Sequence, residues 1–228
     1  MVGPRWRLAS RASWLGAAAL GLLVMSAGTS CGGEAPPPKA ATIAPPSGSS
    51  IALLGPDDFA TIADRRERSR ALFTEASRVL LHPRCINCHP AGDTPTQGDK
   101  LGVHDPPVVR GPDDRGVPGL FCDSCHQDRN GTLARIPGAP HWKLAPRTAA
   151  WVGKSPHAIC EQLKDPARNG KRTLDQIVDH AAHDGIVAWG WAPGADRAPA
   201  PGTQERFGAL VAAWVHDGAE CPAEETKP

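Results

Sequence analysis

The sequence predicts a mainly α-helical, loop-rich domain with no substantial β-sheet. Three observations lead to this prediction. Apolar residues recur at helical spacing in several segments, each preceded by a residue type that caps helices. No segment shows the alternation of apolar and polar residues that marks a half-buried strand. Finally, 24 Gly and 24 Pro among 228 residues make long regular elements scarce.

Composition excludes several classes of protein. A near balance of 25 basic and 24 acidic residues argues against a nucleic-acid-binding protein, which would carry a basic surface. The chain has no Gly-X-Y period, no sustained heptad and only one long apolar run. These absences exclude a collagen, a coiled coil and a polytopic membrane protein.

The first 30 residues predict a signal peptide. Three Arg precede an apolar stretch, residues 14–25, that is too short to span a bilayer comfortably. Small residues at 26–30 then lead to Cys31, as in the bacterial lipobox, where the Cys is acylated. Because Gly28 stands where that pattern has an aliphatic residue, ordinary signal cleavage is the alternative. We therefore expect a periplasmic protein of a Gram-negative bacterium, held at the membrane only by a lipid on Cys31.

Two further segments follow the signal peptide. Residues 31–56 are rich in Pro, Ser and Gly and lack a periodic apolar face, which predicts a flexible tether. Residues 57–228 are the predicted folded domain. Without residues 1–30, which contain three Arg and no acid, the chain keeps 22 basic and 24 acidic residues.

Capping residues and apolar spacing predict four helices in this domain. The first begins at Asp57 or Asp58 and ends by His82, because Pro83 follows. Residues 90–150 are expected to be loops. The other three helices begin after Ser155-Pro156, after Thr173 with its capping-box Gln176, and after Thr203, the last of them ending at Gly218.

The motif C-x-x-C-H occurs twice, and it is typical of covalent haem attachment in c-type cytochromes. Two Cys three residues apart lie on one turn, so each can add to a haem vinyl group, and the adjacent His is placed to bind the iron. Attachment outside the cytoplasm agrees with the signal peptide. We therefore expect two haem c groups, one on Cys85 and Cys88 with His89 as proximal ligand, the other on Cys122 and Cys125 with His126.

Two other uses of paired C-x-x-C motifs fit less well. A zinc ribbon would place the pairs about 15–20 residues apart, closer than they are here, and would not require a His after both. A thioredoxin-like dithiol would sit in a βαβ pattern, which is missing.

The sixth ligand of each iron has to come from His or stay open. Both Met, Met1 and Met25, belong to the predicted signal peptide, so the mature chain has no thioether to offer. His104 follows His89 by 15 residues, and His141 follows His126 by the same interval. Arg110 and Arg147 are 37 residues apart, as are the two motifs, and this spacing suggests a worn internal duplication in which each motif carries its own distal His. Chance spacing is the alternative, with His180 and His183, three apart on one helix, as the competing distal ligands.

Two Cys remain outside the motifs and the N-terminal region. Cys160 lies on a predicted C-terminal helix and Cys221 lies after the last helix. In an oxidising compartment they are expected to form a disulfide that joins the chain end to the body, with free thiols as the alternative.

Several sequence segments resemble a family of bacterial exported proteins labelled isoquinoline 1-oxidoreductase subunit, which are dihaem c-type cytochromes. The resemblance implies a loop-rich c-type cytochrome domain with two covalent haems. It also implies a haem subunit or electron acceptor that serves a molybdenum-containing hydroxylase. It covers about residues 81–222 and rests on residues 82–93 (HPRCINCHPAGD), 110–113 (RGPD), the second C-x-x-C-H, 137–142 (PGAPHW) and 189–191 (WGW).

From the residues and this resemblance we expect a periplasmic dihaem cytochrome that carries electrons for a partner oxidoreductase. The competing hypothesis is a haem enzyme with an open sixth position that reduces peroxide or another small molecule.

Overall fold

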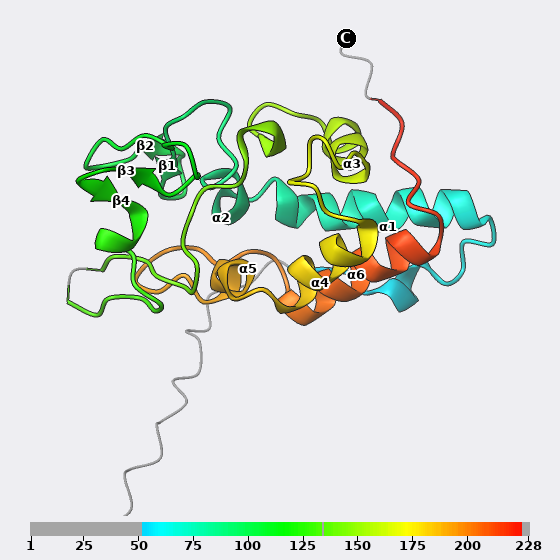
Figure 1. Cartoon of the computed structure of the whole chain (residues 1–228). Coiled ribbons are helices and arrows are strands. Elements are labelled where there is room, and N and C mark those ends of the chain that lie inside the picture. Colours follow the sequence, from blue (N-terminus) through cyan, green and yellow to red (C-terminus); the bar gives the residue numbers. More distant parts are fainter. Residues whose placement is uncertain (1–51, 134, 225–228) are drawn as a thin grey trace, which may run out of the picture. The chain divides into compact units, whose positions relative to one another are not determined.

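A computed structural model of the chain describes residues 52–133 and 135–224 (Figure 1). The chain divides into two units, Met1–Ile43 and Ala44–Pro228, and every described residue belongs to the second. The predicted signal peptide, Cys31 and most of the predicted tether therefore lie outside the described residues.

The described part of the chain is mainly helical and rich in loops, with only two small sheets, as predicted. In Figure 1 the four longest helices lie on one side and the strands on the other. The helices are α1 (Arg65–Leu80), α2 (Pro83–Ile86), α3 (Pro156–Lys164), α4 (Leu174–His183), α5 (Gly185–Ala188) and α6 (Gln204–His216). Single 3₁₀ turns are η1 (Pro56–Phe59), η2 (Cys122–Ser124), η3 (Arg147–Ala149) and η4 (Trp189–Trp191).

The three C-terminal helices begin where the capping residues predict. The side chain of Ser155 accepts a hydrogen bond from the amide of Ala158 at the start of α3. Thr173 and Gln176 form a reciprocal capping box at the start of α4. Thr203 accepts from the amide of Arg206 and so begins α6. These contacts satisfy amide groups that have no partner within the helix.

The predicted start of the first helix is wrong. Residues 56–59 form the separate turn η1, and α1 begins at Arg65 with Asp64 as its cap, accepting from the amide of Glu67. The carbonyl of Ile62 accepts a hydrogen bond from Arg68 Nη1 at 2.9 Å. The Ile62 carbonyl therefore bonds to a side chain of α1 and not to a backbone amide of a continuous helix. This contact separates η1 from α1.

The predicted end of the tether also needs correction. Leu53 is only 2% exposed and belongs to the core, and its carbonyl accepts from Arg206 Nη1 at 3.1 Å. The amide of Leu54 donates to Glu75 Oε1 on α1 at 2.9 Å. Packed structure therefore begins by residue 53 and not at residue 57.

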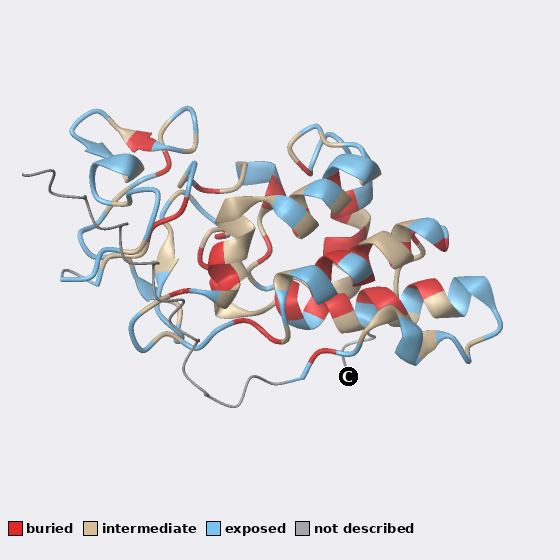
Figure 2. Cartoon of the chain, turned by 90° about the horizontal axis from the view of Figure 1, so that it is seen from below, coloured by how far each residue is buried: buried red, intermediate tan, exposed pale blue. Residues whose placement is uncertain are grey.

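The hydrophobic core lies among α1, α3, α4 and α6. In Figure 2 the buried residues gather on these helices, whereas the loops are mostly exposed. Phe73 on α1 packs against Trp214 on α6, with ring centroids 4.8 Å apart. Gly208 of α6 lies against Ala182 of α4 so closely that a Cβ at residue 208 would clash with the Ala182 backbone.

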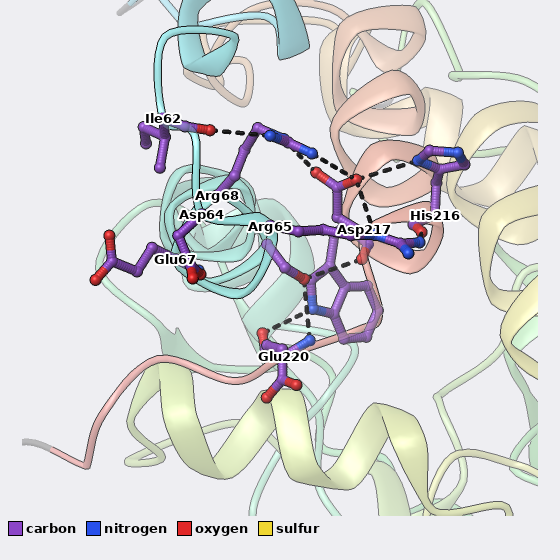
Figure 3. A network of polar contacts seen from close by, with 10 residues as sticks. Ile62, Asp64, Arg65, Glu67, Arg68, His216, Asp217 and Glu220 are labelled. Atoms are coloured by element: carbon purple, nitrogen blue, oxygen red, sulfur yellow. Dashed lines mark hydrogen bonds and ion pairs between the residues drawn. The ribbon is translucent and has the colours of Figure 1, made fainter.

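The C-terminal end of the domain is fastened to this core in two ways. A disulfide joins Cys160 on α3 to Cys221, the pairing expected from the sequence. Asp217, buried at the end of α6, accepts from Arg68 Nε at 2.6 Å and from Arg68 Nη2 at 3.1 Å (Figure 3). The arginine thus binds both carboxylate oxygens, a geometry stronger than a single contact.

Residues 90–150 are mostly loops, as predicted, with two short antiparallel hairpins. Strand β1 (Thr96–Gln97) pairs with β2 (Gly102–Val103), and β3 (Gly116–Val117) pairs with β4 (Leu120–Phe121). Each strand has two residues, so the hairpins shape the loops without forming a layer of the fold. Among the described residues, no helix has the length and apolar character needed to cross a membrane.

Candidate cofactor site

Residues 85–89, here called the first motif, form one tight turn at the end of α2. His82 caps this helix, its ring Nδ1 lying 3.3 Å from the amide of Arg84, and Pro83 occupies the first helical position. Within the turn, the amides of Cys88 and His89 both donate to the carbonyl of Cys85, each at 3.1 Å.

Residues 122–126, the second motif, repeat this turn at η2 without a regular α-helix. The amides of Cys125 and His126 donate to the carbonyl of Cys122 at 3.2 and 2.9 Å. The four motif cysteines form no disulfides. Both motifs therefore place two free thiols and one imidazole on a single turn, although their sequence surroundings differ.

The two motif histidines are oriented in the same way. His89 Nδ1 lies 2.6 Å from the carbonyl of Ala149, and His126 Nδ1 lies 2.7 Å from the carbonyl of Pro137. A carbonyl can only accept, so Nδ1 carries the proton in each neutral ring, and Nε2 keeps its lone pair. This is the arrangement found in metal-bound histidines, where a bond to one nitrogen fixes the other for the metal.

A tryptophan stacks on each of these imidazoles. Trp151 lies on His89 with ring centroids 3.4 Å apart, and Trp142 lies on His126 at 4.5 Å, both with interplanar angles of 7°. Trp142 in turn meets Trp189 edge to face at 5.0 Å. The stacking restricts rotation of both imidazole rings and connects the second motif with the turn η4.

The first motif opens into a cavity of about 280 Å³ between the loops and the helices. Cys85, Cys88 and His89 lie on one side, and residues of α3, α4, η4 and α6 on the others. Most of the accessible wall is apolar, with Trp151, Ile177 and Phe207 among the lining residues. An apolar cavity with a few polar groups is the usual form of a small-molecule or cofactor site.

Burial keeps the first-motif side chains neutral. It raises the pKa of the Cys85 thiol to about 12 and that of Cys88 to about 11. It also lowers the pKa of His89 to about 3. A reactive dithiol of the thioredoxin type needs a thiol whose pKa is lowered. The site therefore favours a neutral imidazole beside two unionised thiols, and disfavours a reactive dithiol.

The two motifs lie near each other. Cys122 of the second motif is close enough for its charge to contribute to the raised pKa of Cys88, after the larger effect of burial. The amide of Ala145, from the loop that follows the second motif, donates to the carbonyl of Cys88 at 3.0 Å. The fold thus brings together two segments that are 37 residues apart in the sequence.

His104 lies beside the second motif and not beside the first, which is not the pairing expected from the spacing. Its ring centroid is 5.9 Å from that of His126, and its Nδ1 lies 2.8 Å from the carbonyl of Pro106. No comparable ring contact joins His104 to His89 among the described residues. The reason is that the loop after the first motif folds back across the second.

His180 and His141 both line the cavity of the first motif. His180 is half-buried, its Nδ1 bonds Asp184 Oδ2 at 2.8 Å, and its charge contributes to the lowered pKa of His89. His141 is exposed and has a left-handed backbone with a φ of 60°. His183, the other competing ligand, points to solvent, with 75% of its side chain exposed. The structure therefore separates the two histidines that the helical spacing had grouped.

Arg110 and Arg147, the pair at matching offsets, meet at one carboxylate. Arg147 Nη2 forms an ion pair with Asp93 Oδ2, and Arg110 Nε lies 3.6 Å from Asp93 Oδ1. Arg110 is buried and also contacts Asp114 and the carbonyl of Ala145. Both arginines therefore join loops of the two motif regions to one another.

Sequence reasoning missed two parts of the site. The tryptophans that stack on the motif histidines follow them by different intervals, so no repeat in the sequence reveals them. Arg84, directly before Cys85, has a fully buried side chain on the cavity wall. A charged residue next to a motif cysteine was visible in the sequence, but its burial depends on the helices that close the cavity.

Comparison of the chain with models of protein families, with curated proteins and with solved structures finds no match. Among the described residues, no group of three or more His, Cys, Asp or Glu side chains is arranged to hold a metal ion. A haem iron differs from such a site, because the porphyrin supplies four ligands and the protein only one or two.

Proposed function

We propose that this protein is a dihaem c-type cytochrome that transfers electrons. One observation carries the proposal: both C-x-x-C-H motifs form the same turn, with two free thiols and a histidine whose Nδ1 is bound to a backbone carbonyl. Two matching sets of donors, one set beside an apolar cavity, are what covalent attachment of two haems requires.

The residues present fit a haem at the first motif. The thiols of Cys85 and Cys88 are free, and His89 has an available Nε2. The cavity beside them is mostly apolar, yet it contains unpartnered buried polar atoms, Trp151 Nε1 among them. Such atoms are rare in folded proteins unless a ligand or water binds them.

The second motif fits as well, in a more open setting. Leu120 and Phe121, directly before Cys122, have exposed fractions of 44% and 46%. Large apolar side chains next to an attachment motif are suited to lie against a porphyrin. The donor set of thiols and imidazole is the same as in the first motif.

When bound, haem supplies an iron that changes between the ferric and ferrous states. The chain's own residues do the rest. Cys85, Cys88, Cys122 and Cys125 hold the two groups covalently. The carbonyls of Ala149 and Pro137 keep His89 and His126 in one tautomer, so that Nε2 would be available to bind the iron. Trp151 and Trp142 limit ring rotation, which favours fast electron transfer because little has to move.

For the distal ligands we propose a crossed arrangement, in which His104 serves the iron on His126 and His180 serves the iron on His89. The ring centroids of His104 and His126 lie 5.9 Å apart, so both imidazoles would be near enough to hold one haem iron. His180 is preferred over His141 because it is half-buried and its Nδ1 is already bound.

The cellular setting remains a proposal from the sequence. The signal peptide and Cys31 favour a periplasmic lipoprotein. The resemblance to the isoquinoline 1-oxidoreductase subunit family favours a partner oxidoreductase with a molybdenum cofactor. The chain itself would receive or deliver electrons and would not bind the partner's substrate.

Optical spectroscopy and a redox titration of the holoprotein test the proposal. We expect purely low-spin spectra in both states, no spectral change when CO is added to the ferrous form, and two low midpoint potentials. Histidine ligation gives lower potentials than methionine ligation. A high-spin component that binds CO would favour the enzymatic alternative, and two high potentials would contradict bis-histidine ligation.

A further inference from the structure

Arg84 has an unusual place in the first motif's cavity. None of its side chain is exposed, and only Nη2 has a charged partner, Asp99 Oδ1. Its Nε and Nη1 are buried and have no hydrogen-bond partner. Leaving such donors unpaired is costly, and the cost is greater when they belong to a charged group.

The surroundings of Arg84 are short of negative charge. The carboxylate of Asp99 is 47% exposed and therefore compensates the buried cation only in part. Burial lowers the pKa of Arg84 most, the charge of Asp99 opposes this effect, and nearby Arg197 adds to it. The guanidinium carbon also lies 5.7 Å from the ring centroid of Trp189, a weak additional attraction.

The rest of the cavity wall has the same imbalance. Its charged side chains are four cations, Arg84, Lys143, Arg168 and Arg172, and the carboxylate of Asp184. Arg168 is paired with Asp165, so three cations face one carboxylate. An occupant of this cavity should therefore be apolar in its body and carry negative charge at its edge.

We propose that Arg84 binds a propionate carboxylate of the haem attached to Cys85 and Cys88, through the unpartnered N–H groups Nε and Nη1. The inference rests on the proposed function. A guanidinium is well suited to this role because its planar array of donors matches a carboxylate. Arg84 directly precedes Cys85, so the side chain that holds the edge of the group and the thiol that holds its body are fixed on the same short helix, α2. Trp151 Nε1, also buried and unpartnered on this wall, is a second donor.

The binding has a redox consequence. A positive charge beside the haem favours the ferrous state, which has one positive charge fewer than the ferric state. Arg84 therefore raises the midpoint potential of the first haem, whereas Asp99, by neutralising part of that charge, lowers it. Substitutions at the two positions should shift this potential in opposite directions, which a purely structural role for Arg84 would not produce.

The test is a redox titration of holoprotein variants in which both haems are counted. In Arg84→Gln we expect the midpoint potential of one haem to fall by at least about 59 mV. For a one-electron couple this shift equals a tenfold change in the ferric-to-ferrous ratio at a fixed potential. Arg84→Lys should recover part of the shift. Asp99→Asn should raise the same potential. Arg66→Gln on α1, where the side chain is 74% exposed, is the matched control and should change neither haem.

The outcomes separate this inference from the proposed function. Suppose that Arg84→Gln and Asp99→Asn each carry two covalent haems and have the same midpoint potentials as Arg66→Gln. This result would overturn the role of Arg84 and leave the proposed function in place. If Arg84→Gln does not mature, Asp99→Asn still decides, because it leaves Arg84 in place and changes a half-exposed residue. A wild-type chain without covalent haem would overturn the proposed function and this inference together.

Discussion

The two C-x-x-C-H motifs share a backbone turn but lie in different surroundings. The first motif packs against the helical core, and Cys85 contacts that core directly. The second motif lies among loops and short hairpins, and its Cys125 is exposed. The same local sequence thus occupies a largely preformed cavity in one place and an open surface in the other.

This difference indicates how much each site would depend on a bound haem. Around the first motif, α3, α4 and α6 bury apolar side chains against one another. Around the second, Leu120, Phe121 and Leu133 are exposed, the last at 98%. If both motifs carry haem as proposed, we expect the haem of the second motif to contribute more to the order of its own surroundings, because the described residues bury little apolar surface there.

The largest expected effect comes from removing one attachment site at a time. Cys122→Ser with Cys125→Ser should leave one haem and lose protection from hydrogen exchange in residues 104–142, while α1 and α6 stay protected. Cys85→Ser with Cys88→Ser should instead lower the protection of the helical core, since it empties a cavity beside that core. Equal loss of protection in both regions for both variants would contradict the proposed difference between the motifs.

Distal-ligand variants give the next largest effect. His104→Ala, made in the variant that keeps only the haem on Cys122 and Cys125, should convert that haem to high spin. His180→Ala should do the same to the haem on Cys85 and Cys88. His183→Ala is the control, since its ring is exposed and bonded to Asp179.

The spin state of each single-haem protein is read from its optical and electron paramagnetic resonance spectra. His104→Ala is also made in the variant that keeps only the haem on Cys85 and Cys88. If it converts that haem to high spin and leaves the haem on Cys122 and Cys125 low-spin, the spacing argument is right and the crossed arrangement is wrong.

Loss of the disulfide should affect the helical region without changing either haem site. The bridge between Cys160 and Cys221 spans 61 residues, and the chain-entropy model gives a stabilisation of about 4 kcal/mol for a loop of that size. Cys160→Ala with Cys221→Ala should lower the free energy of unfolding in denaturant by roughly this amount. The haem spectra should stay the same. A spectral change would show that the packing around the disulfide affects the haem sites.

The smallest expected effect concerns Asp217 and acid. The hydrogen bonds from Arg68 hold the pKa of this carboxyl below its usual range, and His216 adds to the effect. A lowered folded-state pKa means that the stabilisation is complete above the unfolded pKa, near 4, and is lost as the pH falls through the folded value.

Asp217→Asn should therefore be less stable than wild type above about pH 5, with the gap closing at lower pH. Thermal unfolding between pH 2 and pH 7 measures this. Asp113→Asn, at an exposed position, is the control. A gap that stays constant down to pH 2 would mean that the carboxylate charge plays no part.

Features that depend on neighbouring residues could be predicted from the sequence. Ser155, Thr173 and Thr203 cap the helices that follow them, because a cap needs only the next two or three amides. Asp57 and Asp64 are both suitable caps by this rule. In the folded chain Asp64 caps α1 by accepting from the amide of Glu67, and Arg68 also donates to the carbonyl of Ile62 just before the helix.

Features that depend on contacts between distant segments could not be predicted. The interval of 15 residues suggested that His104 belongs with His89, whereas the folded loop brings it to His126. Leu53 was assigned to the tether by composition, but it fills a place in the core beside Gly202. The burial of Arg84 likewise depends on the turn η4 and α6, more than 100 residues later in the chain.

The central claim is that both motifs carry covalent haem, and a pyridine haemochrome assay measures this directly. The protein should be made with its signal peptide in a host that matures c-type cytochromes. We expect two haems per chain that remain attached after denaturation, with the spectrum of haem bound through two thioethers. A colourless chain, or one whose haem is extracted by acidic solvent, would contradict it.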